Sequence, residues 1–173
     1  MKPSTLTNPA LVRDAHRREF FLGPINAWEA RGLRGKMQFA SRTAGLLSGL
    51  GITPCVAAMA ACRQGEAQTS SEARSWDAAE KLVARLRTAG FDARNVSLSI
   101  NAAVDDGCNL ILVENGVVGN QVARTLLFLG GGDLLAHPVL SDAGVVYEDC
   151  SRDEVDFCRH VAFAASWATA LRG

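Results

Sequence analysis

The 173-residue sequence predicts a mainly α protein, a helical bundle with a small β element possible in residues 92–148. Three observations favour this fold class. Apolar residues recur at helical spacing, capping residues precede several of these segments, and proline or glycine falls where helices begin or end. We expect a single domain over residues 1–173, with a helical part at 1–90, a mixed, insertion-like part at 92–148 and a C-terminal helix at 151–173.

Two helices and a shorter helical piece between them are expected upstream of Gly51. A capping residue followed by Pro9 opens the first helix, and Gly23 ends it. A shorter helical piece is expected around Trp28. The next helix begins near Gly35, because its apolar residues repeat every three or four positions: Met37, Ala40, Ala44 and Leu47.

Two more helices are expected after a glycine–proline turn. Thr53 is a suitable N-cap for an alanine-rich helix over residues 54–64, in which Pro54 occupies the first position, where no amide is needed. Ser71 can cap the following helix, which runs to Gly90. The alanine-rich helix allows a neighbouring helix, or another chain, to approach closely.

The middle of the chain has a different character. Alternating apolar residues over 96–100 predict a short half-buried strand, and the apolar run 110–113 predicts a second one. Asn115 and Gly116 either form a hairpin turn or lead through a loop into a helix over residues 121–129.

The end of the chain returns to helix. Residues 145–147 are a possible third strand, and a proline at position 138 limits any helix before it to one turn. Ser151 and Glu154 form a capping-box pattern, which predicts that a helix begins there and runs to the C-terminus.

Charge and cysteine content restrict the function classes. The formal net charge is zero, so no global charge favours nucleic acid or membrane, although residues 1–42 are mostly basic and residues 105–157 mostly acidic. These segments either dock onto partners or are two solvated faces. No apolar run is long enough to span a bilayer, and the five cysteines form no Cys-x-x-Cys pair. We therefore expect a cytoplasmic protein with reduced thiols and no membrane association.

Ligand chemistry is concentrated in two glycine-rich loops, at residues 115–121 and 130–137. A strand-like run precedes the first loop and a helix follows it, which is the context for an anion at a helix N-terminus or for a loop that only turns the chain. The candidate ligand-binding residues are Asn115, Gly116, Gly119, Asn120 and His137.

The sequence predicts no metal, no cofactor and no catalytic residue. The best local group of metal-ligating side chains is Cys150, Cys158 and His160, with His137 as a possible fourth. Cys158 and His160 lie two positions apart on a predicted helix and therefore point in different directions.

One stretch of the chain resembles a known family, the helical small subunit of Cmr-type (type III) CRISPR effector complexes. The resemblance covers about a third of the chain. It rests on the order of Arg34-Gly35-Lys36-Met37, Leu46-Leu47, Gly51-Ile52, Val56-Ala57-Ala58 and Gly65.

This resemblance implies a non-catalytic subunit of a multi-subunit RNA-guided complex. Such a subunit would contact other protein subunits and the nucleic-acid backbone through electrostatic, sequence-independent contacts. The residues expected to bind nucleic acid, all within the basic segment 31–42, are Arg31, Arg34, Lys36 and Arg42.

Two alternatives remain open at the level of sequence. The first is a small cytoplasmic α+β enzyme or ligand-binding protein with its site at the glycine-rich loops 115–121 and 130–137. The second is an adaptor subunit of an unrelated assembly that uses the alanine-rich helix as its contact face.

Overall fold

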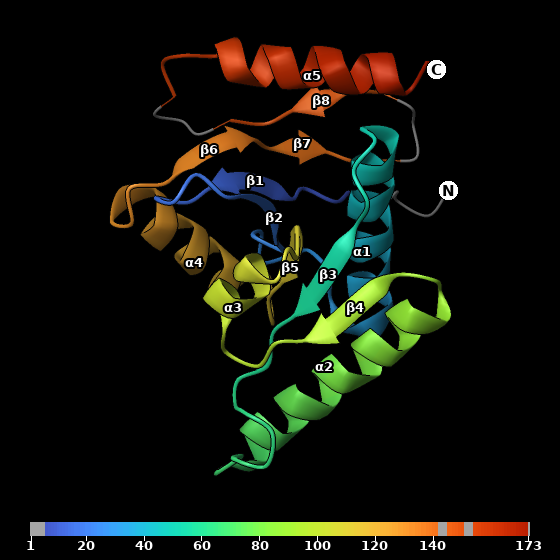
Figure 1. Ribbon diagram of the computed structural model, residues 1–173, viewed down its shortest axis with the longest axis vertical. Coiled ribbons are helices and arrows are strands. Elements are labelled where there is room, and N and C mark those ends of the chain that lie inside the picture. Colours follow the sequence, from blue (N-terminus) through green and yellow to red (C-terminus); the bar gives the residue numbers. More distant parts are fainter. Residues whose placement is uncertain (1–5, 142–144, 151–153, 173) are drawn as a thin grey trace.

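The computed structural model describes residues 6–141, 145–150 and 154–172. Within these residues the chain forms an α/β sandwich, in which helices cover both faces of a six-stranded sheet (Figure 1). The strands of this sheet are β1 (Ala10–Arg13), β2 (Glu19–Gly23), β3 (Cys55–Ala58), β4 (Asp92–Asn95), β5 (Leu110–Leu112) and β6 (Asp133–Ala136). The helices are α1 (Gly32–Gly49), α2 (Ser70–Thr88), α3 (Ile100–Asp105), α4 (Gly116–Phe128) and α5 (Cys158–Ala170).

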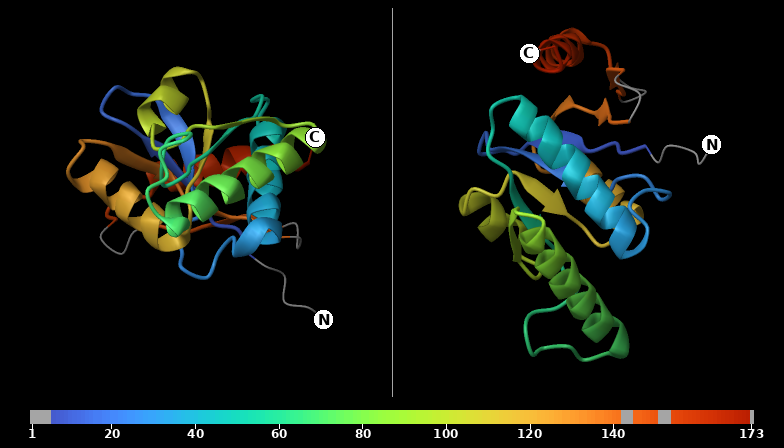
Figure 2. Two further views of the ribbon diagram at one scale, coloured as in Figure 1. Left: turned by 90° about the horizontal axis from the view of Figure 1, so that it is seen from below. Right: turned by 90° about the vertical axis from the view of Figure 1, so that its right-hand side faces the viewer.

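The strand order in the sheet is β4-β3-β5-β2-β1-β6. Strands β4, β3, β5 and β2 are parallel, whereas β1 runs antiparallel to both of its neighbours. A separate two-stranded ribbon of β7 (Pro138–Val139) and β8 (Tyr147–Glu148) follows β6 and is covered by α5. Figures 1 and 2 show α5 at one end of the molecule and α2 at the other.

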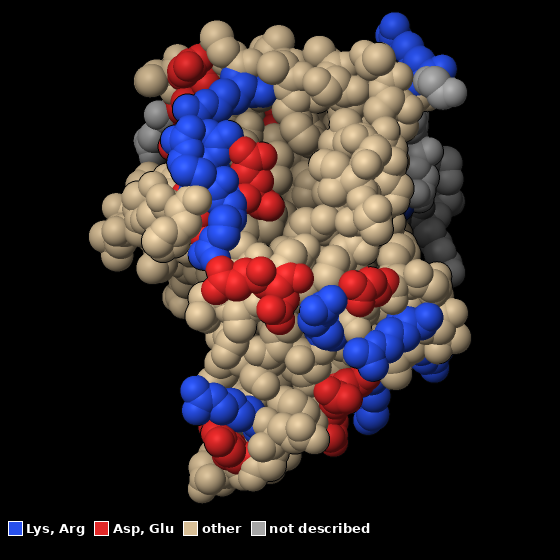
Figure 3. All heavy atoms as spheres, in the orientation of Figure 1, with Lys and Arg blue, Asp and Glu red and all other residues tan. Residues whose placement is uncertain are grey.

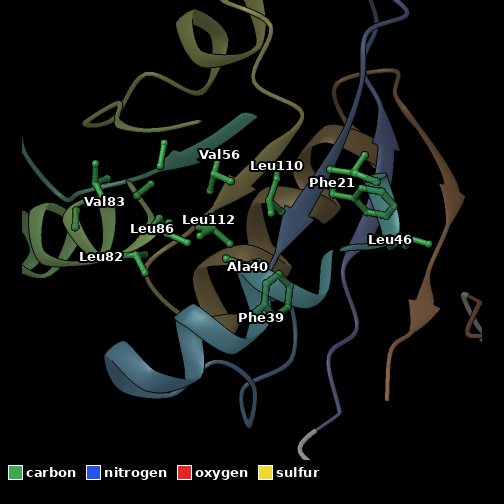
Figure 4. Packing of buried hydrophobic residues seen from close by; sticks show 14 of the residues in the cluster. Phe21, Phe39, Ala40, Leu46, Val56, Leu82, Val83, Leu86, Leu110 and Leu112 are labelled. Carbon is green, nitrogen blue, oxygen red and sulfur yellow. The ribbon is translucent and has the colours of Figure 1, made fainter. Parts of the chain in front are cut away.

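Side chains of successive strand residues enter two separate apolar layers. Leu110 and Leu112 pack with α1 and α2, as Figure 4 shows, while Ile111 and Val113 pack on the other face, with residues of α3 and α4. The parallel strands are therefore buried on both sides, which is the arrangement of α/β proteins with helices on both faces of the sheet.

The predicted helical bundle is wrong, and the alanine-rich segment after Pro54 is the clearest case. It forms the inner strand β3, in which Val56, Ala57 and Ala58 are each no more than 1% exposed. Alanine favours a helix in isolation, but pairing with β4 and β5 and burial between two helical layers override that preference. The small side chains let helices pack closely on both faces of this strand.

The predicted first helix is also wrong, because residues 10–23 form the antiparallel pair β1 and β2. The Asp14 carboxylate closes the turn between them by accepting the backbone N–H groups of His16 and Arg18, both at 2.9 Å. The following Phe20, Phe21 and Leu22 are almost fully buried. A short apolar run of this kind is compatible with a two-sided strand as well as with a helix.

The mixed part at 92–148 contains more strand than the sequence suggested. The strand predicted at 96–100 is wrong, since β4 ends at Asn95, whereas the strand predicted at 110–113 is confirmed as β5. Asn115 and Gly116 lead into α4 rather than a hairpin. The segment before Pro138 is strand β6, and β8 includes Tyr147 from the predicted third strand.

Besides α4, three helices were predicted correctly in type. The helix expected near Gly35 is α1, and the helix expected from Ser71 is α2, whose N-cap is Thr69 in a capping box with Glu72. The C-terminal helix exists as α5 but begins at Cys158. The proposed cap Ser151 lies outside the described residues.

Helix α4 approaches the loop after β2 closely enough to require glycine. A Cβ atom at Gly116 would overlap the backbone carbonyl of Asn26, and one at Gly119 would overlap the carbonyl oxygen of Pro24. Both glycines are buried. Their lack of a side chain therefore sets the position of the α4 N-terminus against this loop.

Replacement of Gly119 by alanine tests this close approach. Because the obstructing atom belongs to the backbone, we expect Gly119→Ala to lower the free energy of unfolding by about 1–3 kcal/mol, the range typical of overpacking. Urea denaturation measures the change. Gly45→Ala is the matched control, since Gly45 lies in α1 with open space around its Cβ position and alanine is the better helix former. Equal stabilities of the two variants would contradict the packing argument.

Candidate functional site

The first candidate site is a crevice at the carboxyl ends of β3 and β5. These neighbouring strands are parallel, but the chain leaves β3 toward α2 on one face of the sheet and β5 toward α4 on the other. Ligands of open α/β sheets bind where successive connections diverge in this way. Here a cavity of about 500 Å³ is lined by side chains from α1 and α2, by Met59 after β3 and by Glu114 after β5.

The crevice carries more positive than negative side chains. Lys36, Arg74 and Lys81 face it together with Asp77 and Glu114. Lys36 is half-buried, and burial lowers its pKa below the usual 10.5, while the neighbouring Glu114 carboxylate opposes that shift. A desolvated ammonium group interacts strongly with an opposite charge, so the crevice suits an anionic group.

The structure does not bring the four predicted nucleic-acid-binding residues together. Lys36 lines the crevice, while Arg31 and Arg34 are exposed at the start of α1. Arg42 lies further along α1 beside a smaller cavity of about 210 Å³ that Trp167 also lines. On the face seen in Figure 3, basic side chains form one band at the upper left and smaller groups below it, and acidic side chains lie beside both.

The second candidate site is a cavity of about 480 Å³ between α4, β6 and the start of α5. We call it the histidine cavity, because His137 and His160 both line it and are more than 90% buried. His160 Nδ1 lies 2.9 Å from Glu148 Oε1, and His137 Nδ1 lies 3.7 Å from Asp149 Oδ2. Burial raises the pKa of Glu148 and lowers that of His137.

Only part of the predicted glycine-loop site meets in this cavity. Asn120 and His137 both line it. Asn115 instead caps α4 by accepting the N–H groups of Val117 and Val118. Gly116 and Gly119, as described above, permit the close packing of α4, so they act in the fold rather than at the cavity.

Sequence reasoning missed Glu148, which orients His160. Glu148 and Asp149 are adjacent carboxylates, and nothing in the local sequence distinguishes such a pair from a solvated loop end. Cys150 lines the cavity, but Cys158 is exposed. Among the described residues, no group of three or more His, Cys, Asp or Glu side chains is arranged to hold a metal ion.

The thiols of Cys55 and Cys62 are poorly suited to nucleophilic catalysis. Burial raises the pKa of Cys55 to about 12, and the Cys108 sulfur, 3.0 Å from the Cys55 sulfur, adds to the shift. Burial also raises the pKa of Cys62. These thiols therefore stay protonated near neutral pH, whereas the thiolate is the reactive form.

Comparison with solved structures identifies the fold as that of the phosphotransacylases. A branched-chain phosphotransacylase from Enterococcus faecalis superposes with a TM-score of 0.72 at 15% identity, over 94% of this chain and 64% of that one. The EutD phosphotransacetylase from Staphylococcus aureus gives 0.68 at 14% identity, over 96% and 54%. At these identities the likeness concerns the fold alone.

Relatives by sequence carry methyltransferase names. The putative methyltransferase mtx subunit X of Methanosarcina mazei is 30% identical over 158 residues, which are 91% of this chain and 56% of the relative. An uncharacterized methyltransferase of Methanopyrus kandleri is 30% identical over 172 residues, 96% of this chain and 63% of the relative. This chain thus spans little more than half the length of these relatives. No family model matches the sequence.

These findings overturn the resemblance to the CRISPR small subunit. That family is all-α, whereas this chain has a mostly parallel sheet and neighbours of the phosphotransacylase fold. A non-catalytic, RNA-binding helical subunit is therefore the wrong interpretation, and the alternative of a small α/β protein with a ligand site fits better. Within the described part of the chain, no helix has the length and apolar character needed to cross a membrane.

Buried His137 makes the stability of the fold depend on pH in a way that can be measured. Because its folded pKa lies below the unfolded value near 6.5, the stability that neutral His137 contributes is complete above pH 6.5 and is lost as the pH falls through 6.5 toward the lowered pKa. We expect His137→Gln to reduce this loss, so that the difference in unfolding free energy between wild type and variant narrows at acid pH.

Urea titrations on both sides of pH 6.5 test this expectation. Glu148 has the opposite dependence, because burial raises its pKa, so only the difference between wild type and variant isolates His137. His16→Gln controls for the loss of an exposed imidazole. If the difference in unfolding free energy between wild type and His137→Gln stays constant with pH, His137 does not titrate on unfolding.

Proposed function

We propose that this chain is an α/β subunit of a group-transfer enzyme and that the crevice at the carboxyl ends of β3 and β5 binds an anionic small molecule. The observation that carries the proposal is Lys36, a half-buried ammonium group placed at the carboxyl ends of β3 and β5. A cation held there without full hydration favours a phosphate or carboxylate group over a neutral ligand.

The other charged side chains of the crevice fit this role. Arg74 and Lys81 extend from α2 toward the same cavity and can contact further oxygens of an anion. Glu114 opposes the lowering of the Lys36 pKa, so it helps to keep that ammonium group charged. Asp77 keeps the crevice from being uniformly basic, which favours a small ligand with both charged and polar groups.

The names of similar proteins support the reaction class. The structural neighbours are a phosphotransacylase and a phosphotransacetylase, and the sequence relatives are called methyltransferases, so both sets of names describe transfer of a group. The Methanosarcina relatives are named as subunits, which supports protein partners for this chain as well. The group transferred is left open by these names, since they differ.

Replacement of Lys36 tests the proposed site. We expect Lys36→Met to weaken the binding of inorganic phosphate and of acetyl phosphate about tenfold or more, because one charge-assisted hydrogen bond contributes roughly 1.5–3 kcal/mol. Isothermal titration calorimetry on the whole chain measures the affinity. The methionine keeps the length and apolar stem of the lysine, so the packing of α1 is retained.

Arg85→Gln is the matched control, because Arg85 is exposed on α2 and does not line the crevice. We expect the control to bind both anions as the wild type does. Equal weakening in both variants would point to a general charge effect, and no change in Lys36→Met would remove Lys36 from the site.

A further inference from the structure

The histidine cavity lies apart from the crevice at β3 and β5 and plays no part in the proposed function. It opens on the α4 face of the sheet, whereas the crevice is lined by α1 and α2. Its volume of about 480 Å³ lies within the range typical of small-molecule sites. The residues around it show which chemistry it can accept.

Buried polar atoms at this cavity lack partners. His160 Nε2, His137 Nε2 and Glu148 Oε2 have no hydrogen-bond partner among the described residues, although they are shielded from solvent. The His160 side chain is only 6% exposed, and that of Glu148 only 9%. Buried polar groups without partners are unfavourable, so a bound group that satisfies them is stabilised.

The orientation of His160 fixes what its free nitrogen can do. In the neutral ring, Nδ1 donates to Glu148 Oε1 at 2.9 Å, which leaves Nε2 as an acceptor. Glu154 Oε2 lies 3.7 Å from Nε2, too far for a direct hydrogen bond. A single donor placed between these two acceptors can reach both of them.

The charge around the cavity favours a cationic donor. Five carboxylates border it or its histidines: Asp133, Glu148, Asp149, Glu154 and Asp156. Two arginines also line it: Arg159 faces Asp133 at 3.6 Å, and Arg124 lies over the Phe128 ring at 5.1 Å, so carboxylates outnumber basic side chains around the cavity. An ammonium group therefore fits better than an anion or a neutral donor.

Much of the remaining wall of the cavity is apolar. Ile25, Ala123, Leu127 and Leu134 line it on the side of the sheet and α4. These side chains can cover an aliphatic chain, and the described residues offer no grouped ligands for a metal ion. An organic cation matches both the carboxylates and the apolar side chains of the lining.

We propose that the histidine cavity binds an aliphatic primary amine. Its ammonium group donates to His160 Nε2 and to the Glu154 carboxylate, and its carbon chain packs against the apolar side chains of α4 and β6. This site shares no lining residue with the anion site at Lys36.

Calorimetry of the whole chain with n-butylamine tests the proposal, with n-butanol and n-butyrate as matched probes of the same chain length. We expect saturable binding of the amine and at least tenfold weaker binding of the alcohol and the acid. Glu154→Gln should weaken amine binding about tenfold, since it removes the charge but keeps the oxygen that accepts from the backbone of Val155 and Asp156.

Glu66→Gln is the control, because Glu66 is exposed in the loop after β3, and it should bind the amine as the wild type does. Lys36→Met should also leave amine binding unchanged, so this test fails or succeeds separately from that of the crevice. The proposal is overturned if the amine does not bind saturably, if butanol binds equally well, or if Glu154→Gln retains wild-type affinity.

Discussion

The fold depends on the burial of two very short parallel strands on both faces. β3 and β5 hold only four and three residues, yet almost none of their surface reaches solvent, apart from Cys55 at the start of β3. Complete burial of a side chain such as Leu110 or Ile111 contributes roughly 1.5–3 kcal/mol, and strands this short need that contribution from both sides. Two helical layers are therefore required, and the chain must leave neighbouring strands in opposite directions. The crevice at their carboxyl ends is a geometric consequence of that requirement.

The sequence predicted the elements whose signals are local. Helices α1 and α2 have a 3.6-residue period and well-placed ends, and β5 is an apolar run bounded by polar residues. The prediction failed at β1, β2 and β3. In β2 and β3, burial on both faces removes the alternation that identifies a strand, and β1 is only four residues long. In β3 the alanines also favour helix, so only the pairing with β4 and β5, which is not visible in the sequence, decides the conformation. With three inner strands assigned to helices, a bundle was the natural but incorrect conclusion.

The candidate sites were less predictable than the fold, because they too depend on contacts between distant parts of the chain. Lys36 was singled out for its place in a basic segment, but its importance comes from burial beside Glu114, which only the fold creates. Asn120 and His137 were named together, and both line the histidine cavity. Glu148 and His160, which complete that cavity, come from β8 and α5, and bringing them to His137 requires the pairing of β7 with β8. Long-range contacts of this kind leave no periodic signal in a single sequence.

One loop connects the two sites physically. The segment between β2 and α1 contributes Ile25 to the histidine cavity and leads directly into Lys36 at the crevice. It is held by the buried Glu29 carboxylate, which accepts the backbone N–H groups of Asn8 at 2.6 Å and of Asn26 at 3.0 Å. The Asn8 side chain in turn donates to Asp149 at 3.2 Å, beside His137. A chain of hydrogen bonds thus runs from the wall of one cavity to the loop that positions the other. Because α4 also packs on this loop through Gly116 and Gly119, the loop is fixed from two directions, and the geometry of each site depends on the same few buried contacts.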